Sequence, residues 1–275
     1  MRFGIDIAQQ RLEWSEIVDR ARFAEELGFE GLWGFDHFKP MYGQGPGNCF
    51  EGMTTLAALA TATTRIRLGL LVTGVTYRHP SVLTAEAVTI DHASNGRLDL
   101  ALGAAWFINE HEELGIPFPP IGARADLLED TVEIVKRLCT GDVVSYQGRR
   151  VSLVDAQLRP VPVQRPHPPI WIGASGEKRT LPLTGRYADA WHCYGGPDDL
   201  KRRWDIVKHA AEEAGRDPRS ILRSTSLSLS GDLDSVRRSA DAYAAAGLEY
   251  LVCGWPGEGR DRITEFVEKV LPALA

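Results

Sequence analysis

One histidine beside a carboxylate stands out among the residues that could carry chemistry. Asp36 and His37 directly follow the short apolar run 31–35. Histidine titrates near neutral pH, and a neighbouring charge tunes its affinity for a proton, so it can serve as an acid or a base. An Asp-His pair by itself is also typical of a structural loop. The position after an apolar run makes His37 the best candidate for proton transfer.

A second group of residues is suited to binding an anion. The segment 173–179 reads Gly-Ala-Ser-Gly-Glu-Lys-Arg and joins a predicted strand to a predicted helix. Its small residues leave backbone N–H groups accessible, while Ser175 and Lys178 add a hydroxyl and a positive charge. The same residues could form a tight turn with Ser175 as the helix N-cap. A phosphate or phosphodiester site is compatible with both interpretations.

Other chemistries have less support in the sequence. The chain has seven histidines but no His-Glu-x-x-His motif, and the acidic run 110–113 is expected on a solvated face, so we expect no metal site. Neither a Gly-x-Ser-x-Gly nucleophile elbow nor a Gly-x-Gly-x-x-Gly fingerprint is found. The four cysteines form no Cys-x-x-Cys pair, which favours reduced thiols.

Alternating strands and helices must position these residues. Short apolar runs predict eight strands, at 3–7, 31–35, 66–73, 98–104, 170–174, 190–193, 222–230 and 250–255. Between them apolar residues recur at helical spacing, as in 14–27 and 263–274. Eight such units in 275 residues predict one α/β domain over 1–275, a closed (β/α)8 TIM barrel.

One segment departs from the alternation. Residues 142–158 have the pattern of a hairpin and are followed by a proline-rich stretch, so 142–169 is predicted to be an insertion between strands four and five. In a parallel barrel the active site lies at the carboxyl ends of the strands. Asp36, His37 and the segment 173–179 all follow predicted strands, so we expect them at that end.

The overall composition limits the partners. A formal charge of −6 argues against nonspecific nucleic-acid binding. The first residues lack the apolar core of a signal peptide, and no apolar run approaches the roughly 18 residues that span a membrane. We therefore expect a cytoplasmic protein whose partner is a small molecule.

The motifs taken in order are similar to those of the bacterial luciferase-like oxidoreductases. The resemblance covers nearly the whole chain and is closest to the deazaflavin-dependent branch, which uses coenzyme F420. It rests on five stretches, namely 28–37, 65–73 with 77–80, 91–98 with 103–106, 166–179, and 187–191. Each stretch alone is weak evidence, but the five in this order are specific.

The resemblance implies hydride transfer between the deazaflavin and an organic substrate, with His37 moving the proton and with the chain as a homodimer. The matching cofactor-binding positions are Asp36, then Leu71, Val72 and Thr73 at a strand-three bulge that in this family often contains a non-prolyl cis peptide, then Ala104, Ala105 and Asn109, and finally Ser175, Gly176 and Lys178 at the phosphate end.

Two positions depart from the sugar-phosphate dehydrogenases of the family. Those enzymes carry a catalytic glutamate where this chain has Trp106, and a tryptophan where it has Met41. Oxidation of a sugar phosphate is therefore not expected. We assign Met41 and Trp106 to the substrate pocket, where an indole suits a flat or apolar substrate.

Three alternatives remain open at this stage. The same fold could bind FMN, reduced by a separate reductase, and act as a monooxygenase. It could store a flavin without catalysis, which an occluded His37 would indicate. It could also be a metal-free sugar-phosphate isomerase, with Glu110 as the base and a phosphate site near the segment 254–260.

Overall fold

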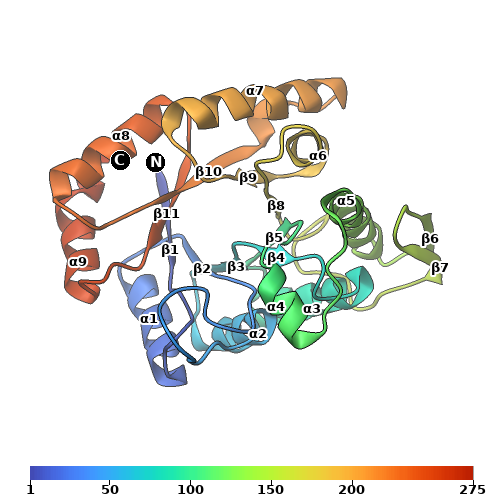
Figure 1. Ribbon diagram of the computed structural model, residues 1–275, viewed down its shortest axis with the longest axis horizontal. Helices are drawn as coiled ribbons and strands as arrows, with labels where there is room; N and C mark the ends of the chain where they lie inside the picture. The colour runs from blue at the N-terminus through green and yellow to red at the C-terminus, as the bar shows by residue number, and fades with distance from the viewer. Residues whose placement is uncertain (275) are drawn as a thin grey trace.

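Strands and helices alternate along the residues that the computed structural model describes, 1–274 (Figure 1). The strands of the main sheet are β1 (Arg2–Asp6), β2 (Gly31–Gly34), β3 (Arg67–Leu70), β4 (Thr73–Gly74), β5 (Leu98–Gly103), β8 (Ile170–Gly173), β9 (Ala190–His192), β10 (Leu222–Leu227) and β11 (Tyr250–Gly254). The helices are α1 (Trp14–Glu26), α2 (Gly52–Ala62), α3 (Pro80–Ala93), α4 (Ile108–Leu114), α5 (Ile121–Leu138), α6 (Thr180–Tyr187), α7 (Pro197–Glu213), α8 (Leu233–Ala245), α9 (Arg260–Lys269) and α10 (Leu271–Leu274).

The main sheet closes on itself. Its strands are hydrogen-bonded in the order β3-β2-β1-β11-β10-β9-β8-β5-β4, and β3 also pairs with β5. All of these pairings are parallel. Because β3 and β4 are two pieces of one predicted strand, the nine strands of the sheet make an eight-stranded barrel. The predicted (β/α)8 barrel is confirmed, although the predicted domain end at 275 lies one residue outside the described range.

Three large aromatic side chains fill the interior of the barrel. The Trp33 and Trp171 rings lie 4.7 Å apart, and the Trp33 indole N–H donates to the Tyr250 hydroxyl at 3.2 Å. Glycines make room for them: a Cβ on Gly4 would lie 2.6 Å from the Trp33 indole nitrogen. The packed interior supports the residues at the carboxyl ends of the strands.

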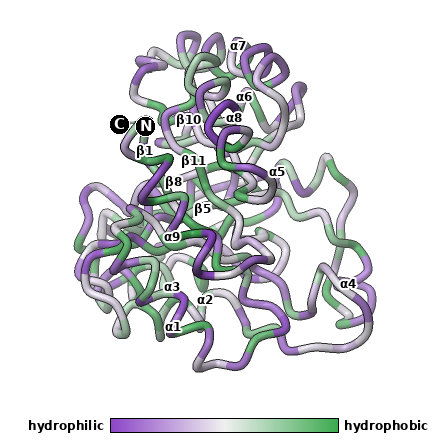
Figure 2. Tube along the Cα trace, turned by 90° about the vertical axis from the view of Figure 1, so that its left-hand side faces the viewer, coloured by the Kyte–Doolittle hydropathy of each residue, from purple (hydrophilic) through white to green (hydrophobic). Residues whose placement is uncertain are grey.

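The outer helices bury one face each, as the periodicity predicted. In α1 the buried residues are Ile17, Ala21 and Ala24, and in α9 they are Ile263 and Phe266. Figure 2 shows hydrophilic residues along much of α7 at the outer edge of the molecule. No helix within 1–274 is long and apolar enough to cross a membrane.

Two predicted strands are shorter than expected. The run 66–73 is interrupted between β3 and β4, where the Leu71–Val72 peptide bond is cis, a feature that the resemblance described as frequent in the family and left undecided for this chain. Val72 lies against Gly103 and Gly173, the last residues of β5 and β8, and a Cβ on Gly173 would be 2.7 Å from the Val72 Cγ1. The run 222–230 ends as a strand at 227, and its remaining residues form a loop.

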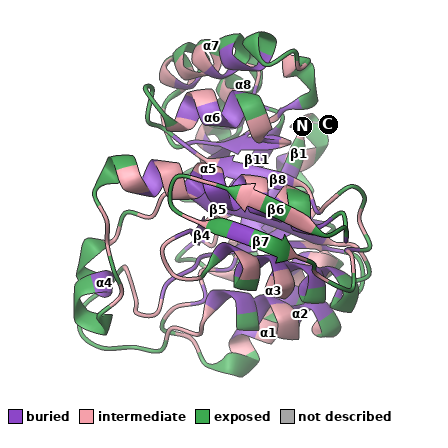
Figure 3. Ribbon diagram, turned by 90° about the vertical axis from the view of Figure 1, so that its right-hand side faces the viewer, coloured by how far each residue is buried: buried purple, intermediate pink, exposed green. Residues whose placement is uncertain are grey.

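Two segments extend away from the barrel. The strands β6 (Val144–Gln147) and β7 (Ser152–Ala156) form an antiparallel hairpin in the connection between α5 and β8. Helix α4 lies in the long connection between β5 and α5, and Figure 3 shows it at the edge of the molecule with a largely exposed surface. Its buried residues, Glu110 and His111, face back toward the barrel strands.

Candidate active site at the carboxyl ends of the strands

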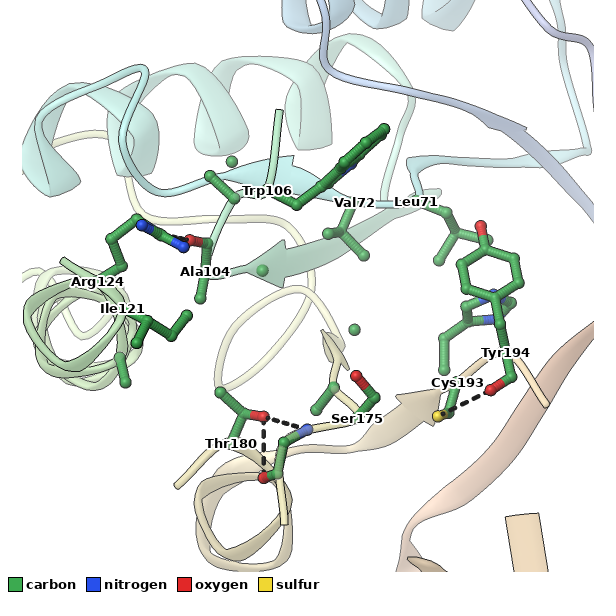
Figure 4. Close-up of a pocket in the computed structure, with 18 of the residues that line it drawn as sticks. Leu71, Val72, Ala104, Trp106, Ile121, Arg124, Ser175, Thr180, Cys193 and Tyr194 are labelled. Carbon is green, nitrogen blue, oxygen red and sulfur yellow. Dashed lines mark hydrogen bonds between the residues drawn. The ribbon is translucent and has the colours of Figure 1, made fainter. Parts of the chain in front are cut away.

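A cavity of about 1060 Å³ opens at the carboxyl ends of β2, β5, β8 and β9. Figure 4 shows residues of four separate connections around it, with Trp106 and Val72 on one side and Ser175 and Thr180 on another. Most of the predicted site residues line the cavity: Asp36, His37, Met41, Leu71, Val72, Ala104, Ala105, Trp106, Ser175, Gly176 and Lys178. The barrel therefore brings together the histidine and the segment 173–179, which was predicted to bind an anion.

Two predicted residues lie elsewhere. Thr73 is buried in β4 and is not part of the cavity wall, because neighbouring residues of a strand point to opposite faces and Gly74 occupies the wall position. Asn109 is exposed on α4, which turns its side chain away from the cavity.

His37 contacts a buried carboxylate that lies in an acidic run predicted to be on a solvated face. Its Nδ1 lies 2.9 Å from Oε2 of Glu110. The expectation of a solvated face is wrong for Glu110 and His111, which are both fully buried. The reason is tertiary: α4 packs these two residues against the connections that follow β2 and β4.

Glu110 is held by further donors. The Tyr77 hydroxyl donates to Oε2 at 2.6 Å, and the backbone N–H groups of Phe38 and Lys39 donate to Oε1 at 2.6 and 3.0 Å. Burial raises the pKa of Glu110, but the hydrogen bonds from His37, Tyr77 and Phe38 outweigh it and lower the pKa overall. The same contacts act on Tyr77, whose pKa is raised by burial and by the Glu110 charge.

Asp36 is engaged by an arginine. The Arg78 guanidinium donates to its two carboxylate oxygens at 2.7 and 2.9 Å, and the backbone N–H of Gly74 donates at 3.0 Å. Burial raises the pKa of Asp36, and the Arg78 charge opposes the rise. Arg78 also contacts Glu51. Asp36 is thus fixed in place directly beside His37.

A small apolar surface adjoins His37. Leu71, Val72, Ala104 and Ala105 belong to the cavity wall. Arg124, which also lines the cavity, donates to the Ala104 carbonyl oxygen at 2.9 Å. The apolar side chains of this surface carry no charge and can contact the face of a planar ring system.

The segment 173–179 forms the opposite end of the cavity. Helix α6 begins only at Thr180, so the alternative of Ser175 as its N-cap is wrong. The Gly176 N–H donates to the Thr180 hydroxyl at 3.1 Å, which orders the loop (Figure 4). Glu177 pairs with Arg202 at 2.8 Å and Arg179 pairs with Asp126. Within residues 1–274, the exposed Lys178 of this loop has no ion-pair partner, in contrast to Glu177 and Arg179.

The mouth of the cavity is aromatic. Trp106 is 63% exposed and stacks on Phe107 at 5.1 Å between ring centroids. Its ring centroid lies 5.9 Å from that of His37. Tyr42 and Tyr194 line the same cavity and are each 66% exposed. A substrate beside His37 would therefore meet aromatic side chains.

Several residues of the site were not singled out from the sequence. Tyr77 and Arg78 lie in the stretch after predicted strand three, and His192 lies at the end of predicted strand six, so their places at strand ends were the available signal. His192 lines the cavity, accepts or donates a hydrogen bond with the Ser224 hydroxyl at 3.0 Å, and has a pKa lowered to about 4 by burial. It is therefore a neutral imidazole near pH 7.

Comparison with known proteins gives a consistent result. The model of the luciferase-like monooxygenase family matches residues 1–265. An F420-dependent glucose-6-phosphate dehydrogenase of Microbacterium testaceum is 32% identical over 254 residues, covering 90% of this chain and 74% of the relative. A second protein of that description, from Amycolatopsis mediterranei, is 26% identical and covers 100% of this chain and 98% of the relative.

A solved structure shares the fold. An F420-dependent secondary alcohol dehydrogenase, in complex with an F420-acetone adduct, superposes with a TM-score of 0.90 at 19% identity, over 100% of this chain and 99% of that one. At this identity the superposition establishes the closed barrel and its connections alone.

Proposed function

The chain belongs to the luciferase-like monooxygenase family, and from this premise we propose that it transfers hydride between coenzyme F420 and a small organic substrate. It is an oxidoreductase in which His37 takes up or returns the accompanying proton. The observation that carries the proposal is the place of His37, on the cavity wall and 2.9 Å from the buried carboxylate of Glu110. Hydride transfer needs such a proton acceptor within reach of the substrate.

The residues of the cavity fit a deazaflavin. Leu71, Val72 and Ala104 would support its ring, and Ser175, Gly176 and Lys178 would hold its phosphate. The absence of side chains at Gly103 and Gly173 lets Val72 project between β5 and β8. The cavity volume of about 1060 Å³ lies at the upper end of the range for ligand pockets, as a large coenzyme would require.

The protein contributes orientation and proton transfer. A bound deazaflavin accepts or donates hydride by its own chemistry. The apolar wall fixes the ring face, the Lys178 end fixes the phosphate, and the aromatic mouth restricts water around the substrate. His37, between the wall and the mouth, accepts a proton from a substrate hydroxyl or returns one to a carbonyl oxygen.

The substrate is proposed to be uncharged and flat or apolar. Trp106 and Met41 replace the glutamate and tryptophan expected in a sugar-phosphate dehydrogenase. Two cations near His37 in the chain are already paired, because Lys39 contacts Glu113 at 2.7 Å and Arg78 contacts Asp36. Neither of these two cations is free to bind a substrate phosphate, whereas an aromatic or alkyl group would contact the Trp106 ring.

Two alternatives lose support from the geometry. A storage protein would have an occluded His37; this side chain is buried, at 7% exposure, but it lines the cavity wall and can be reached from there. A sugar-phosphate isomerase would need Glu110 as a free base, but both of its oxygens accept hydrogen bonds and it is not in the cavity wall. The segment 254–260 also lies outside the wall.

A parallel titration tests the cofactor. The purified protein is titrated with F420 and with FMN without oxygen, and binding is followed by fluorescence. We expect F420 to bind at least tenfold more tightly, a difference of about 1.4 kcal/mol. Reduction of F420 by simple secondary alcohols, without oxygen consumption, would complete the test. Tighter binding of FMN together with oxygen consumption would favour a monooxygenase instead.

A further inference from the structure

Four hydrogen-bond donors converge on one carboxylate beside the cavity. Oε2 of Glu110 faces His37 Nδ1 at 2.9 Å and the Tyr77 hydroxyl at 2.6 Å. Oε1 accepts from the backbone N–H groups of Phe38 and Lys39 at 2.6 and 3.0 Å. The side chain is fully buried and its pKa is lowered by these contacts against the effect of burial. Glu110 is therefore ionised and acts only as an acceptor.

We propose that Glu110 is a positioning residue that determines which nitrogen of His37 carries the proton. Because an ionised carboxylate cannot donate, Nδ1 of the neutral imidazole must be protonated, and Nε2 is left with a free lone pair. Within residues 1–274, both hydrogen bonds of the His37 ring involve Nδ1. Nε2 is not one of the buried side-chain atoms that lack a hydrogen-bond partner, so it is accessible from the cavity. Nε2 is thus the atom available to the cavity.

This arrangement makes His37 a base toward the substrate, an inference that rests on the proposed function. When an alcohol is oxidised, its O–H bond breaks and the proton goes to Nε2. Its carbon-bound hydrogen leaves as hydride to F420, and a carbonyl product forms. The resulting imidazolium lies 2.9 Å from the Glu110 carboxylate, which stabilises its charge in a buried site. The reverse reaction returns the same proton to the carbonyl oxygen.

Replacing Glu110 with glutamine keeps the shape of the side chain but changes which of its atoms donate and accept hydrogen bonds. This change is expected to move the proton of the His37 ring. The amide has one acceptor oxygen and one donor NH2 group. If the oxygen keeps the fixed backbone N–H groups of Phe38 and Lys39, the NH2 faces Nδ1 of His37. Nδ1 must then accept, and the proton moves to Nε2. The imidazole would occupy the same place with the wrong tautomer, which elsewhere is enough to remove most of a catalytic rate.

The kinetic test compares two substitutions on the same helix. Glu110→Gln is expected to lower kcat by about 100-fold or more, with a smaller change in KM and with F420 affinity within threefold of the parent. Glu113→Gln is the matched control, because Glu113 lies one turn later on α4 and contacts only the exposed Lys39 in this region. It is expected to keep kcat within twofold.

A spectroscopic test needs no turnover. Nitrogen-15 NMR of histidine-labelled parent protein should show His37 protonated at Nδ1 and unprotonated at Nε2, with the signal assigned by its loss in His37→Gln. Glu110→Gln should show the opposite tautomer. An Nε2-protonated parent, or a Glu110→Gln variant with kcat within threefold, would overturn the inference. If Glu110→Gln does not fold, the spectrum of the parent protein still shows which nitrogen of His37 carries the proton and so tests the inference. Failure of the proposed function would show differently, as a parent protein that neither binds nor reduces F420.

Discussion

Arg78 holds both carboxylate oxygens of Asp36, at 2.7 and 2.9 Å, immediately behind the histidine of the site. Both side chains are largely buried, with exposed fractions of 10% and 1%. A buried carboxylate that loses its partner remains as an uncompensated charge or must take up a proton. The Asp36–Arg78 pair is therefore expected to contribute both to the stability of the barrel and to the position of His37, which follows Asp36 in the chain.

Removal of this arginine should destabilise the fold. Arg78→Met leaves Asp36 buried without its cation and is expected to lower the free energy of unfolding by about 3 to 5 kcal/mol. Urea unfolding followed by circular dichroism measures the change. Arg202→Met is the control, because Arg202 forms exposed pairs with Glu177 and Asp199 and should have little effect. Equal stability of both variants would contradict the prediction.

Substitution of the cavity histidine should separate rate from binding. His37→Gln is expected to lower the rate of hydride transfer by about 100-fold or more and to leave F420 affinity within about tenfold of the parent. Rapid mixing with a secondary alcohol gives the rate, and fluorescence titration gives the affinity. His209→Gln, at an exposed site on α7, should change neither. If His37→Gln turns over at the rate of the parent, His37 has a structural role and does not transfer the proton.

The anion end should depend on Lys178. Lys178→Glu replaces attraction by repulsion and is expected to weaken F420 binding by about 1 to 2 kcal/mol, the range of a charge-assisted hydrogen bond. Lys208→Glu, on the exposed face of α7, is the matched control for the loss of positive charge. If both variants bind F420 equally well, Lys178 does not contact the phosphate.

The close packing around Val72 gives a further test. A Cβ on Gly103 would overlap the Val72 side chain, so Gly103→Ala is expected to cost about 1 to 3 kcal/mol of stability and to weaken F420 binding. Gly257→Ala adds a Cβ where no atom lies within 4 Å and serves as the control. Thermal unfolding and the F420 titration provide the two measurements. If Gly103→Ala binds F420 with the affinity of the parent, Val72 does not contact the ring of the coenzyme.

Acid should destabilise the protein through His192. Its pKa is lowered from 6.5 to about 4 by burial, so between these values the unfolded chain binds a proton that the folded chain does not. Stability therefore falls as the pH drops from about 6.5 to about 4, by up to about 3 kcal/mol for this group. His192→Gln should reduce the fall, measured as unfolding free energy at about pH 7 and pH 4.5. His209→Gln should keep the fall of the parent.

The parts of this structure that depend on local pattern could be predicted from the sequence. Apolar runs located the barrel strands to within a few residues, and the rule that active sites lie at strand ends placed His37, Trp106 and Lys178 near one another. The interruption at Leu71 and Val72 followed only from the family resemblance, because no local pattern distinguishes it from a continuous strand.

The parts that depend on tertiary contact could not be predicted. Glu110 lies 73 residues after His37, and nothing in its acidic surroundings indicates that α4 turns it inward. Asn109, its neighbour, faces outward for the same reason. The homodimer and the cytoplasmic location stay predictions, since a single chain does not test them.

The hydrogen bonds that close the barrel also determine which strand ends lie near one another around the cavity. In the order of the strands, β2 and β8 are five steps apart by way of β1, but the pairing of β3 with β5 shortens the path to three. Neighbouring strands are about 4.8 Å apart. Leu68 pairs with Leu98 and Gly69 with Asp99 at this junction. The short path through this junction brings the loop that follows β2 and the loop that follows β8 to the rim of one cavity.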